Sequence, residues 1–243
     1  MIWKIDQSQS EFRFNGWEGG FNLSHPEQGL HVTAPHGSKL ENLLGVTFPN
    51  PRQPFFQDCY TRLGDLVAAY PQRDARKFNV QLDYRLLDAT PESLLVELWV
   101  SVQTYLLDSH PSVSVRCALD STTVTNYLAD EMDELTVEKS GSQTVSDNTR
   151  HIASPHRAVI SGQSSEKNLY VAWFNHPRDQ FDTTWSKQSD EHNEDAQLFG
   201  HFMEKGVIRR GRMQCWIHRK PIGLSSLQEQ YRSFAGSPLP LTT

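Results

Sequence analysis

Two short motifs place a histidine beside a carboxylate and a proline. The first is Asp108-Ser-His-Pro111 and the second is Asn175-His-Pro-Arg-Asp179. Each directly follows a predicted strand, and loops at the ends of a rigid sheet commonly carry function. A neutral imidazole beside a carboxylate can act as a general base near neutral pH, so the candidate catalytic residues are Asp108, His110 and His176. The alternative is that both motifs are His-Pro turns selected for backbone shape.

Aromatic side chains bracket the second motif. Trp173 precedes it, and Phe181 and Trp185 follow it. Flat aromatic faces beside amide, guanidinium and carboxylate groups suit a sugar, whose C–H face stacks while its hydroxyls form hydrogen bonds. The candidate ligand-binding residues are therefore Trp173, Arg178, Asp179, Asp182 and Trp185. The alternative is a core tryptophan next to a surface loop.

The ten histidines and three cysteines do not form a metal motif. No HExxH sequence is present, and Cys59, Cys117 and Cys215 are too far apart for a CxxC pair. A metal centre needs several ligands converging at about 2.0–2.2 Å, and the spacing predicts none, so neither a metal nor a cofactor is assigned. The chain also lacks a Walker loop, GxGxxG and GxSxG, which disfavours nucleotide-dependent and α/β-hydrolase chemistry.

Composition restricts the partners. The 243 residues carry a net charge of −6, whereas domains that bind nucleic acid electrostatically are usually basic. No apolar run approaches the ~18 residues that span a bilayer, and the segment from Met1 to Ser10 lacks the apolar core of a signal peptide. The sparse, odd number of cysteines fits a reducing compartment. We therefore predict a cytoplasmic protein that binds no nucleic acid and no membrane, with assembly into a homo-oligomer left open.

The scaffold that must position these residues is predicted to be β-structure. Residues 78–104 contain two runs of alternating apolar and polar side chains, joined by the turn-rich segment 88–93. This pattern predicts an antiparallel hairpin. Opposite charges favour the register that sets Arg85 against Glu97, because a two-residue slip would set Asp83 against Glu97. The core face is then Val80, Leu82, Leu98 and Val100, and Trp99 lies on the polar face.

Other segments predict further strands and two helices. Hairpins are expected at 55–70, with Leu63-Gly64 as the turn, and at 158–174; single strands are expected at 113–119, 122–127 and 207–218. Acidic residues ahead of an apolar stripe predict a helix from Glu191 to Lys205. Ser226-x-x-Glu229 resembles a capping box that opens a short helix to Ala235. The arginines of segment 205–220 are expected to pair with acidic residues of 190–195.

These elements predict one mainly β domain spanning residues 1–243, an antiparallel β-sandwich with one or two peripheral helices. An acidic and then Ser/Gly/Asp/Asn-rich stretch predicts a mobile loop near 129–150. The Pro/Thr-rich tail at 237–243 is expected to be frayed.

The strand pair, the run Glu204-Lys-Gly-Val-Ile-Arg-Arg210 and the β content resemble uncharacterised bacterial β-sandwich proteins and galactose-mutarotase-like domains. The resemblance covers residues 55–220 and implies an architecture only, because no catalytic motif matches residue by residue. Three hypotheses remain open. The chain binds a carbohydrate or related polar small ligand without catalysis; or it is a mutarotase-like or other sugar-active enzyme with His110 or His176 as acid/base; or it is a structural or interaction protein with no small-molecule site.

Overall fold

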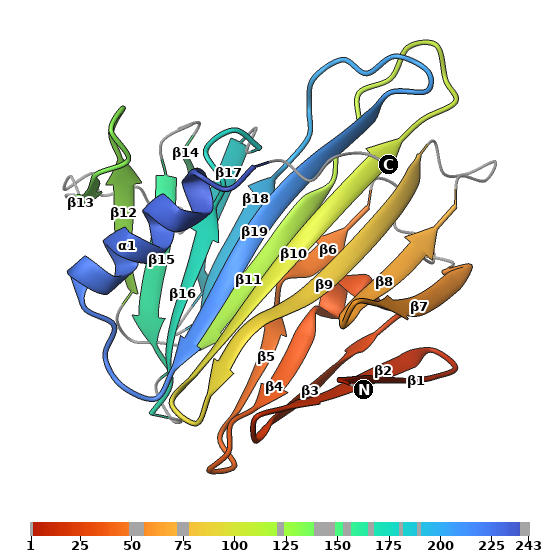
Figure 1. Ribbon diagram of the computed structural model, residues 1–243. Coiled ribbons are helices and arrows are strands. Elements are labelled where there is room, and N and C mark those ends of the chain that lie inside the picture. Colours follow the sequence, from red (N-terminus) through yellow and green to blue (C-terminus); the bar gives the residue numbers. More distant parts are fainter. Residues whose placement is uncertain are drawn as a thin grey trace.

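The computed structural model describes residues 2–48, 56–71, 78–120, 124–138, 149–152, 157–164, 168–179, 182–188 and 191–238. In these residues the chain forms antiparallel strands in three sheets and one α-helix (Figure 1). The two smaller sheets lie on one side of the large sheet, so the predicted antiparallel β-sandwich is confirmed. Within the same residues, no helix is both long enough and apolar enough to cross a membrane.

The large sheet has nine strands in the order β13-β12-β15-β16-β19-β10-β9-β8-β7. Its strands are β7 (Asp58–Arg62), β8 (Asp65–Tyr70), β9 (Asn79–Thr90), β10 (Ser93–Gln103), β12 (Val124–Ala129), β13 (Leu135–Val137), β15 (Arg157–Gln163), β16 (Tyr170–Asn175) and β19 (Ile208–His218). The predicted strand pairs at 55–70, 78–104 and 158–174 are thus confirmed as hairpins of this sheet.

The other layer is built from two five-stranded sheets. The first contains β1 (Trp3–Asp6), β2 (Gln9–Phe14), β3 (Trp17–Asn22), β4 (Leu30–Thr33) and β5 (Lys39–Leu43), with the 3-10 turn η1 (Pro26–Gln28) before β4. The second contains β14 (Thr149–Ile152), β17 (Asp182–Gln188), β18 (Glu191–Gln197), β11 (Ser114–Asp120) and β6 (Gly45–Thr47). The two sheets meet where β5 lies close to β11.

The central hairpin of β9 and β10 has the predicted register. Glu97 lies opposite Arg85, and the Arg85 Nη1 donates to Glu97 Oε2 at 2.6 Å. The predicted core face is also confirmed, because Val80, Leu82, Leu98 and Val100 are at most 2% exposed. Their side chains lie in the main hydrophobic core, so alternation alone was enough to separate the inner face from the outer face.

The helix predicted from Glu191 to Lys205 is wrong. Residues 191–197 form β18, which pairs with β11 on one side and with β17 on the other. A strand in this position satisfies backbone groups on both neighbours, and a helix would leave those groups without partners. Alternate residues His192, Glu194 and Ala196 are buried, which is the strand period. The apolar stripe on which the helix prediction rested, Leu198, Phe199, Phe202 and Met203, lies entirely in the segment that follows the strand.

The single α-helix, α1 (Leu224–Ala235), confirms the helix predicted near the C-terminus. It begins two residues before the predicted capping box, because Gly223 is the N-cap and makes no side-chain cap. Its buried residues Leu227, Tyr231 and Phe234 pack on Val159 and Phe174 of the large sheet. The helix therefore covers the face of β15 and β16 that points away from the other layer (Figure 1).

The structure describes parts of the segments predicted to be a mobile loop and a frayed tail. Residues 130–134 form a turn in which the Asp130 carboxylate accepts from the backbone of Met132 and Glu134, and β13 follows. Ser237 and Pro238 are bound by Arg212. Residues 139–148 and 239–243, on which the rest of these predictions fall, lie outside the described residues.

The turn between β7 and β8 stores backbone strain at a leucine. Leu63 has φ 52° and Gly64 has φ 94°, the combination of a two-residue hairpin turn that favours Asn-Gly. The Leu63 side chain gains little from burial, since the residue is 98% exposed. Leu63→Asn is therefore expected to increase the free energy of unfolding by up to about 1 kcal/mol, measured by urea denaturation. Leu107→Asn, at an exposed leucine without a positive φ, is the control and should give no increase.

Candidate functional site

Polar side chains gather on the outer face of the large sheet, where α1 does not cover it. They come from adjacent strands in register, because Asp83 lies opposite Trp99, Trp99 opposite Arg212, and Ser101 opposite both Gln81 and Arg210. We call this group, in which buried Glu97 and Ser101 lie among partly exposed side chains, the polar platform. It consists of Asp65, Gln81, Asp83, Arg85, Glu97, Trp99, Ser101 and Arg210, on β8, β9, β10 and β19.

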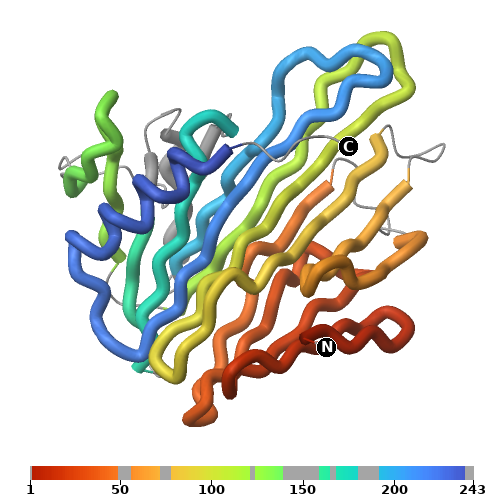
Figure 2. Tube along the Cα trace, viewed as in Figure 1, coloured from red at the N-terminus to blue at the C-terminus, as the bar shows by residue number. Residues whose placement is uncertain are grey.

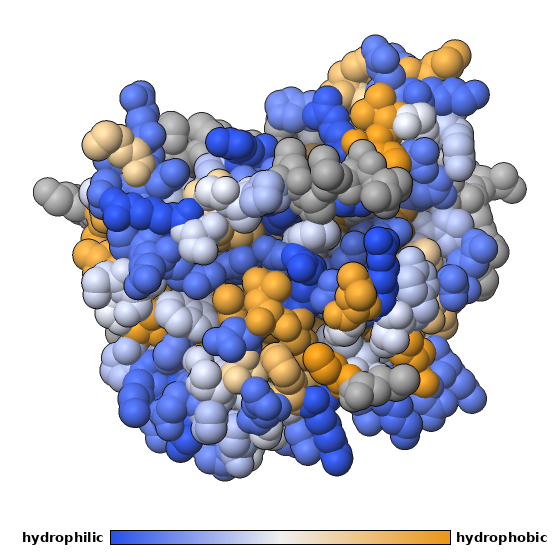
Figure 3. All heavy atoms as spheres, viewed as in Figure 1, coloured by the Kyte–Doolittle hydropathy of each residue, from blue (hydrophilic) through white to orange (hydrophobic). Residues whose placement is uncertain are grey.

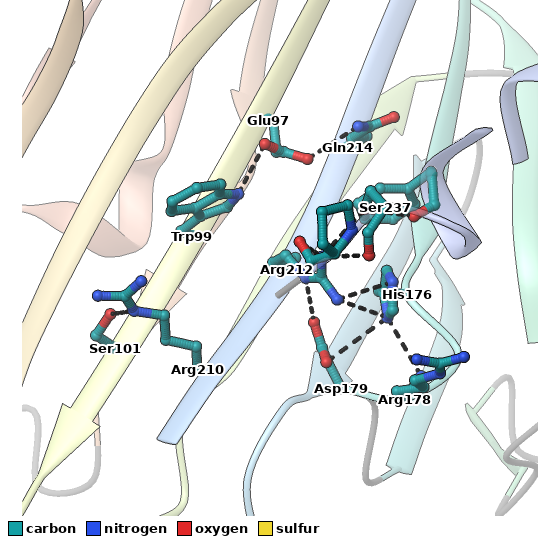
Figure 4. Close-up of polar contacts among 12 residues, drawn as sticks. Glu97, Trp99, Ser101, His176, Arg178, Asp179, Arg210, Arg212, Gln214 and Ser237 are labelled. Carbon is teal, nitrogen blue, oxygen red and sulfur yellow. Dashed lines mark hydrogen bonds and ion pairs between the residues drawn. The ribbon is translucent and has the colours of Figure 1, made fainter. Parts of the chain in front are cut away.

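The Glu97 carboxylate connects three other side chains on this face of the sheet. Its Oε2 accepts from Arg85 Nη1 at 2.6 Å. Oε2 also accepts from Trp99 Nε1 at 2.7 Å, and Oε1 accepts from Gln214 Nε2 at 2.9 Å (Figure 4). The side chain is only 5% exposed. A carboxylate that accepts three hydrogen bonds, one of them from a cation, is held in one orientation and orients its donors in turn.

Cations surround the Trp99 ring. The guanidinium carbon of Arg85 lies 4.1 Å from the ring centroid and that of Arg210 lies 5.9 Å away. Arg85 Nε also donates to Asp65 at 3.1 Å. Arg210 Nε donates to Ser101 Oγ at 3.0 Å (Figure 4). Stacking and hydrogen bonding together fix the planes of both guanidinium groups. The platform thus presents oriented N–H donors at the solvent boundary.

Carboxylates supply the acceptors. Asp83 accepts from Gln81 Nε2 at 2.9 Å, and Asp65 is 30% exposed beside Arg85. Burial raises the pKa of Asp83, against the opposing effects of Gln81 and Arg210. Burial also raises the pKa of Asp65, and Arg85 counteracts it. The platform combines donors and acceptors of fixed direction, which is what recognition of a polyhydroxy compound requires.

The second His-Pro motif forms a separate, buried cluster beside the platform. Arg212 Nε donates to Asp179 Oδ2 at 2.7 Å, and Arg212 Nη2 lies 2.8 Å from His176 Nε2 (Figure 4). Arg212 Nη1 donates to Ser237 Oγ at 3.0 Å and to the Pro238 carbonyl at 3.2 Å. The side chains of His176, Asp179 and Arg212 are at most 3% exposed. The cluster therefore ties the end of α1 to the sheet.

Burial and the neighbouring arginines decide the charge of His176. Burial comes first, followed by Arg212 and Arg178, and together they lower the pKa of His176 to about 4. The imidazole is thus neutral near neutral pH, as a general base must be. Its contacts are nevertheless internal: Phe234 packs edge-on at 5.0 Å between ring centroids, and the Arg178 N–H points at Nδ1. Asp179, whose pKa is raised by burial, lies 3.6 Å from the same nitrogen.

The first His-Pro motif lies at the same end of the sheet but in solvent. Because β10 and β16 both run antiparallel to β19, the loops that follow them leave the sheet at one end. His110 and Asp108 are 64% and 79% exposed, and His110 Nε2 lies 4.0 Å from Asp108 Oδ1. This distance is longer than a hydrogen bond. The ring of His110 instead packs edge-on against Phe202.

Trp173, one of the predicted ligand-binding aromatic residues, does not present its ring beside the second motif. Trp173 is 1% exposed on the inner face of β16, where its Nε1 donates to Glu194 of the other layer. Asn175 donates to the same carboxylate at 2.8 Å, so these residues join the two layers. Asp182 and Trp185 belong to β17 of the other layer, and their side chains lie outside the described part. Of the predicted ligand-binding residues, Arg178 is exposed and Asp179 is buried.

The platform was only partly foreseeable. The Arg85–Glu97 pair and the position of Trp99 followed from alternation, but Arg210 reaches them only through the β10–β19 pairing. The arginines of segment 205–220 were expected to pair with the acidic segment 190–195. In the structure Asp195 pairs with Arg116 at 2.9 Å, and Arg212 pairs with Asp179. A sequence signal for the platform did exist, since Arg210 and Arg212 share one face of a predicted strand with Trp216 and His218.

A cavity of about 630 Å³ lies elsewhere, on the outside of the β1–β5 sheet. Charged side chains of both signs surround it, including Lys4, Glu11, Arg13, Glu18, Lys39 and Glu41. Its two aromatic residues, Trp3 and Phe12, are each 1% exposed and belong to the core. The cavity offers no aromatic surface to a ligand, and the Arg13–Glu18 pair is solvent-exposed. Among the described residues no group of three or more His, Cys, Asp or Glu is placed to hold a metal.

Comparisons with known proteins identify the fold. No family model matches the chain, and no curated protein matches it in sequence. A TPR-domain-containing protein from Parabacteroides distasonis aligns over 90% of this chain and 48% of its own, with a TM-score of 0.61 and 7% identity. This chain therefore spans about half the length of that protein. A galactose mutarotase-like protein from Lactobacillus casei aligns over 86% of this chain and 99% of its own, with a TM-score of 0.57 and 10% identity. The predicted architectural resemblance is confirmed, at the level of the fold.

Proposed function

We propose that the polar platform binds a carbohydrate, or a related polar small molecule, without reacting with it. The observation that carries this proposal is the set of guanidinium and carboxylate groups held in fixed directions around Trp99 and Glu97. A guanidinium or a carboxylate can engage two neighbouring hydroxyls of a sugar at once. Groups that are already oriented lose little conformational freedom on binding, which favours affinity.

The role of Trp99 differs from that of a stacking platform. Because Arg85 and Arg210 lie over its ring, the ring orients the guanidinium groups, and the ligand hydroxyls meet those groups and Asp83. The fold adds support, since one of the similar solved structures is described as galactose mutarotase-like. Trp173 and His176 are buried, so a ligand cannot reach them. We therefore place the binding site at the platform and not at the second His-Pro motif.

The test is a thermal-shift screen of neutral sugars, sugar phosphates and uronic acids, followed by calorimetry on any compound that stabilises the protein. Arg210→Gln and Asp83→Asn are each expected to weaken binding of that compound about 10- to 100-fold, because a hydrogen bond to a charged group contributes roughly 1.5–3 kcal/mol. Arg116→Gln is the matched control, since Arg116 is a half-exposed arginine of the other layer. The proposal fails if no carbohydrate binds, or if both platform variants bind as tightly as the control.

A mutarotase-like activity is the second candidate. It is favoured by the raised pKa of Asp83, since a carboxyl group with a raised pKa is better suited to proton transfer near neutral pH. His110 and His176 were the expected acid/base residues. His176 is enclosed by Arg212 and Phe234, while His110 stands in solvent away from the platform contacts. Asp83 is therefore the better candidate for the proton-transfer group.

This second candidate has its own test. Exchange NMR of the anomers of each bound sugar should show interconversion faster than in buffer, and Asp83→Asn should remove the acceleration. His110→Gln should leave the rate unchanged, because its ring contacts are with the neighbouring loop. Binding without acceleration leaves the first proposal standing and excludes the second.

A further inference from the structure

We propose that the protein forms a two-fold symmetric dimer through a projecting arm at the end of the large sheet. The arm is made of two loops, residues 104–113 after β10 and residues 198–207 before β19, together with Ile208. In Figure 2 these loops, yellow-green and blue, run side by side and extend beyond the neighbouring strands. This proposal is independent of the carbohydrate site, because none of the platform residues belongs to the arm.

The arm is a built element. The Met203 N–H donates to the Ser109 carbonyl at 2.8 Å, and Ser109 Oγ donates to the Met203 carbonyl at 3.1 Å. Further backbone bonds join Gly206 to Thr104 at 2.9 Å and Leu198 to Val113 at 3.1 Å. Met203 and Ser109 are buried between the loops. These hydrogen bonds already hold the two loops together. Binding a partner there therefore costs little additional conformational entropy.

The surface of the arm is unusually apolar. Of the eleven large hydrophobic residues exposed in the described part of the chain, five are on the arm: Tyr105 at 57%, Leu107 at 81%, Phe202 at 45%, Val207 at 39% and Ile208 at 46%. Figure 3 shows hydrophobic side chains gathered at the corresponding upper right corner of the molecule. Isolated exposed apolar residues need no explanation, but a cluster on one projection indicates an interaction site.

Charges around the cluster identify a second copy as the occupant. Exposed Asp108 and Glu204 stand beside exposed Lys205, with Arg209 at the base of the arm. In a two-fold dimer the same patch of both copies forms the interface, so charged groups in the patch must include both signs if the patch is to complement itself. This one does. The two carboxylates also disfavour an anionic membrane surface, which attracts predominantly basic patches.

The small size of the apolar patch predicts that the two copies associate weakly. One arm carries five exposed apolar residues, fewer than a standard interface has, so the dimer should be weak and dependent on concentration.

The arm also gives the first His-Pro motif a structural role. His110 packs against Phe202 and its Nδ1 lies 3.4 Å from the Gly200 carbonyl, so it shapes the arm.

Sedimentation velocity over a wide range of protein concentration tests the proposal on the full chain. The wild-type protein is expected to shift from monomer to dimer as its concentration rises. Leu107→Asp and Phe202→Asp should each weaken association at least tenfold, because two-fold symmetry introduces every new charge twice. Leu63→Asp is the matched control, a leucine that is 98% exposed on the distant β7–β8 turn, and it should dimerise like the wild type.

Thermal melts of each variant confirm that it is folded before it is compared. A wild-type chain that remains monomeric at every concentration overturns the proposal, and so does a dimer that survives both arm substitutions. Equal loss of association in Leu63→Asp would show that the contact is nonspecific and also overturns it. Monomers that float with neutral phosphatidylcholine vesicles through Leu107 would identify a lipid surface as the occupant in place of a second copy.

Discussion

Arg212→Met is expected to lower the free energy of unfolding by roughly 3–5 kcal/mol, the range observed when one partner of a buried ion pair is removed. The guanidinium is 2% exposed and bonds Asp179, His176, Ser237 and Pro238. Without it, the Asp179 carboxylate, 3% exposed, loses its cation and must be buried as a charge or protonated. Urea denaturation followed by circular dichroism measures the loss.

The control for this prediction is Arg219→Met, at the next arginine along the same segment. Arg219 pairs with Glu92 at 3.4 Å, but both side chains are more than a third exposed. Removing an exposed pair is expected to change stability by less than about 1 kcal/mol. The double variant Arg212→Met/Asp179→Leu should recover part of the lost stability, since it leaves no buried charge alone. Similar losses for Arg212→Met and Arg219→Met would contradict the assignment of Arg212 as a buried anchor.

The contrast between these arginines shows what the sequence can and cannot predict. Arg85 was placed correctly because its partner lies in the same hairpin, where alternation and charge fix the register. Arg212 was expected to meet the acidic segment nearby in sequence, yet its partner Asp179 is brought in by the β16–β19 pairing. Pairing between strands far apart in sequence leaves no local periodic signal. The positions of Arg210 and Arg212, which depend on such pairing, were therefore not predicted.

The failure at residues 191–197 has a related cause. Acidic residues followed by apolar ones satisfy the local rules for a helix, and the tertiary structure overrides them. Glu194 is buried because Trp173 and Asn175 of the opposite layer donate to its carboxylate. The sequence cannot reveal that an acidic residue has two buried donors on another sheet. The same contact explains why Trp173 belongs to the core and is not available to a ligand.

Stability is expected to fall as the pH is lowered from about 6.5 to about 4, and His176 is the main cause. The pKa of His176 is lowered from 6.5 to about 4 in the folded protein, because burial and the Arg212 charge disfavour the imidazolium. The unfolded chain therefore binds a proton at a higher pH than the folded chain does. Its contribution to stability is complete above about pH 6.5 and is lost on acidification, by up to about 3 kcal/mol at 1.36 kcal/mol per pKa unit.

His218, at the other end of β19, and Asp179, beside His176, modify this pH profile in known directions. The pKa of His218 is also lowered by burial, so His218 adds to the loss. The pKa of Asp179 is raised by burial, so protonation of Asp179 favours the folded state and opposes the loss near the acidic end. His176→Gln keeps a hydrogen-bonding side chain next to Arg212 but removes its titration. Urea denaturation across this pH range should therefore give a flatter profile for His176→Gln than for the wild type.

His36→Gln separates this effect from the general loss of a histidine. His36 is exposed in the turn between β4 and β5, and its substitution should leave the pH profile unchanged. If His176→Gln and wild type lose stability in parallel, the neutral buried imidazole is not the source of the acid sensitivity. If only His176→Gln is flat, the cluster of His176, Asp179 and Arg212 acts as a pH-sensitive anchor for the end of α1. In that case the histidine that the sequence presents as a candidate base has a structural role, because it holds the end of α1 beside the platform.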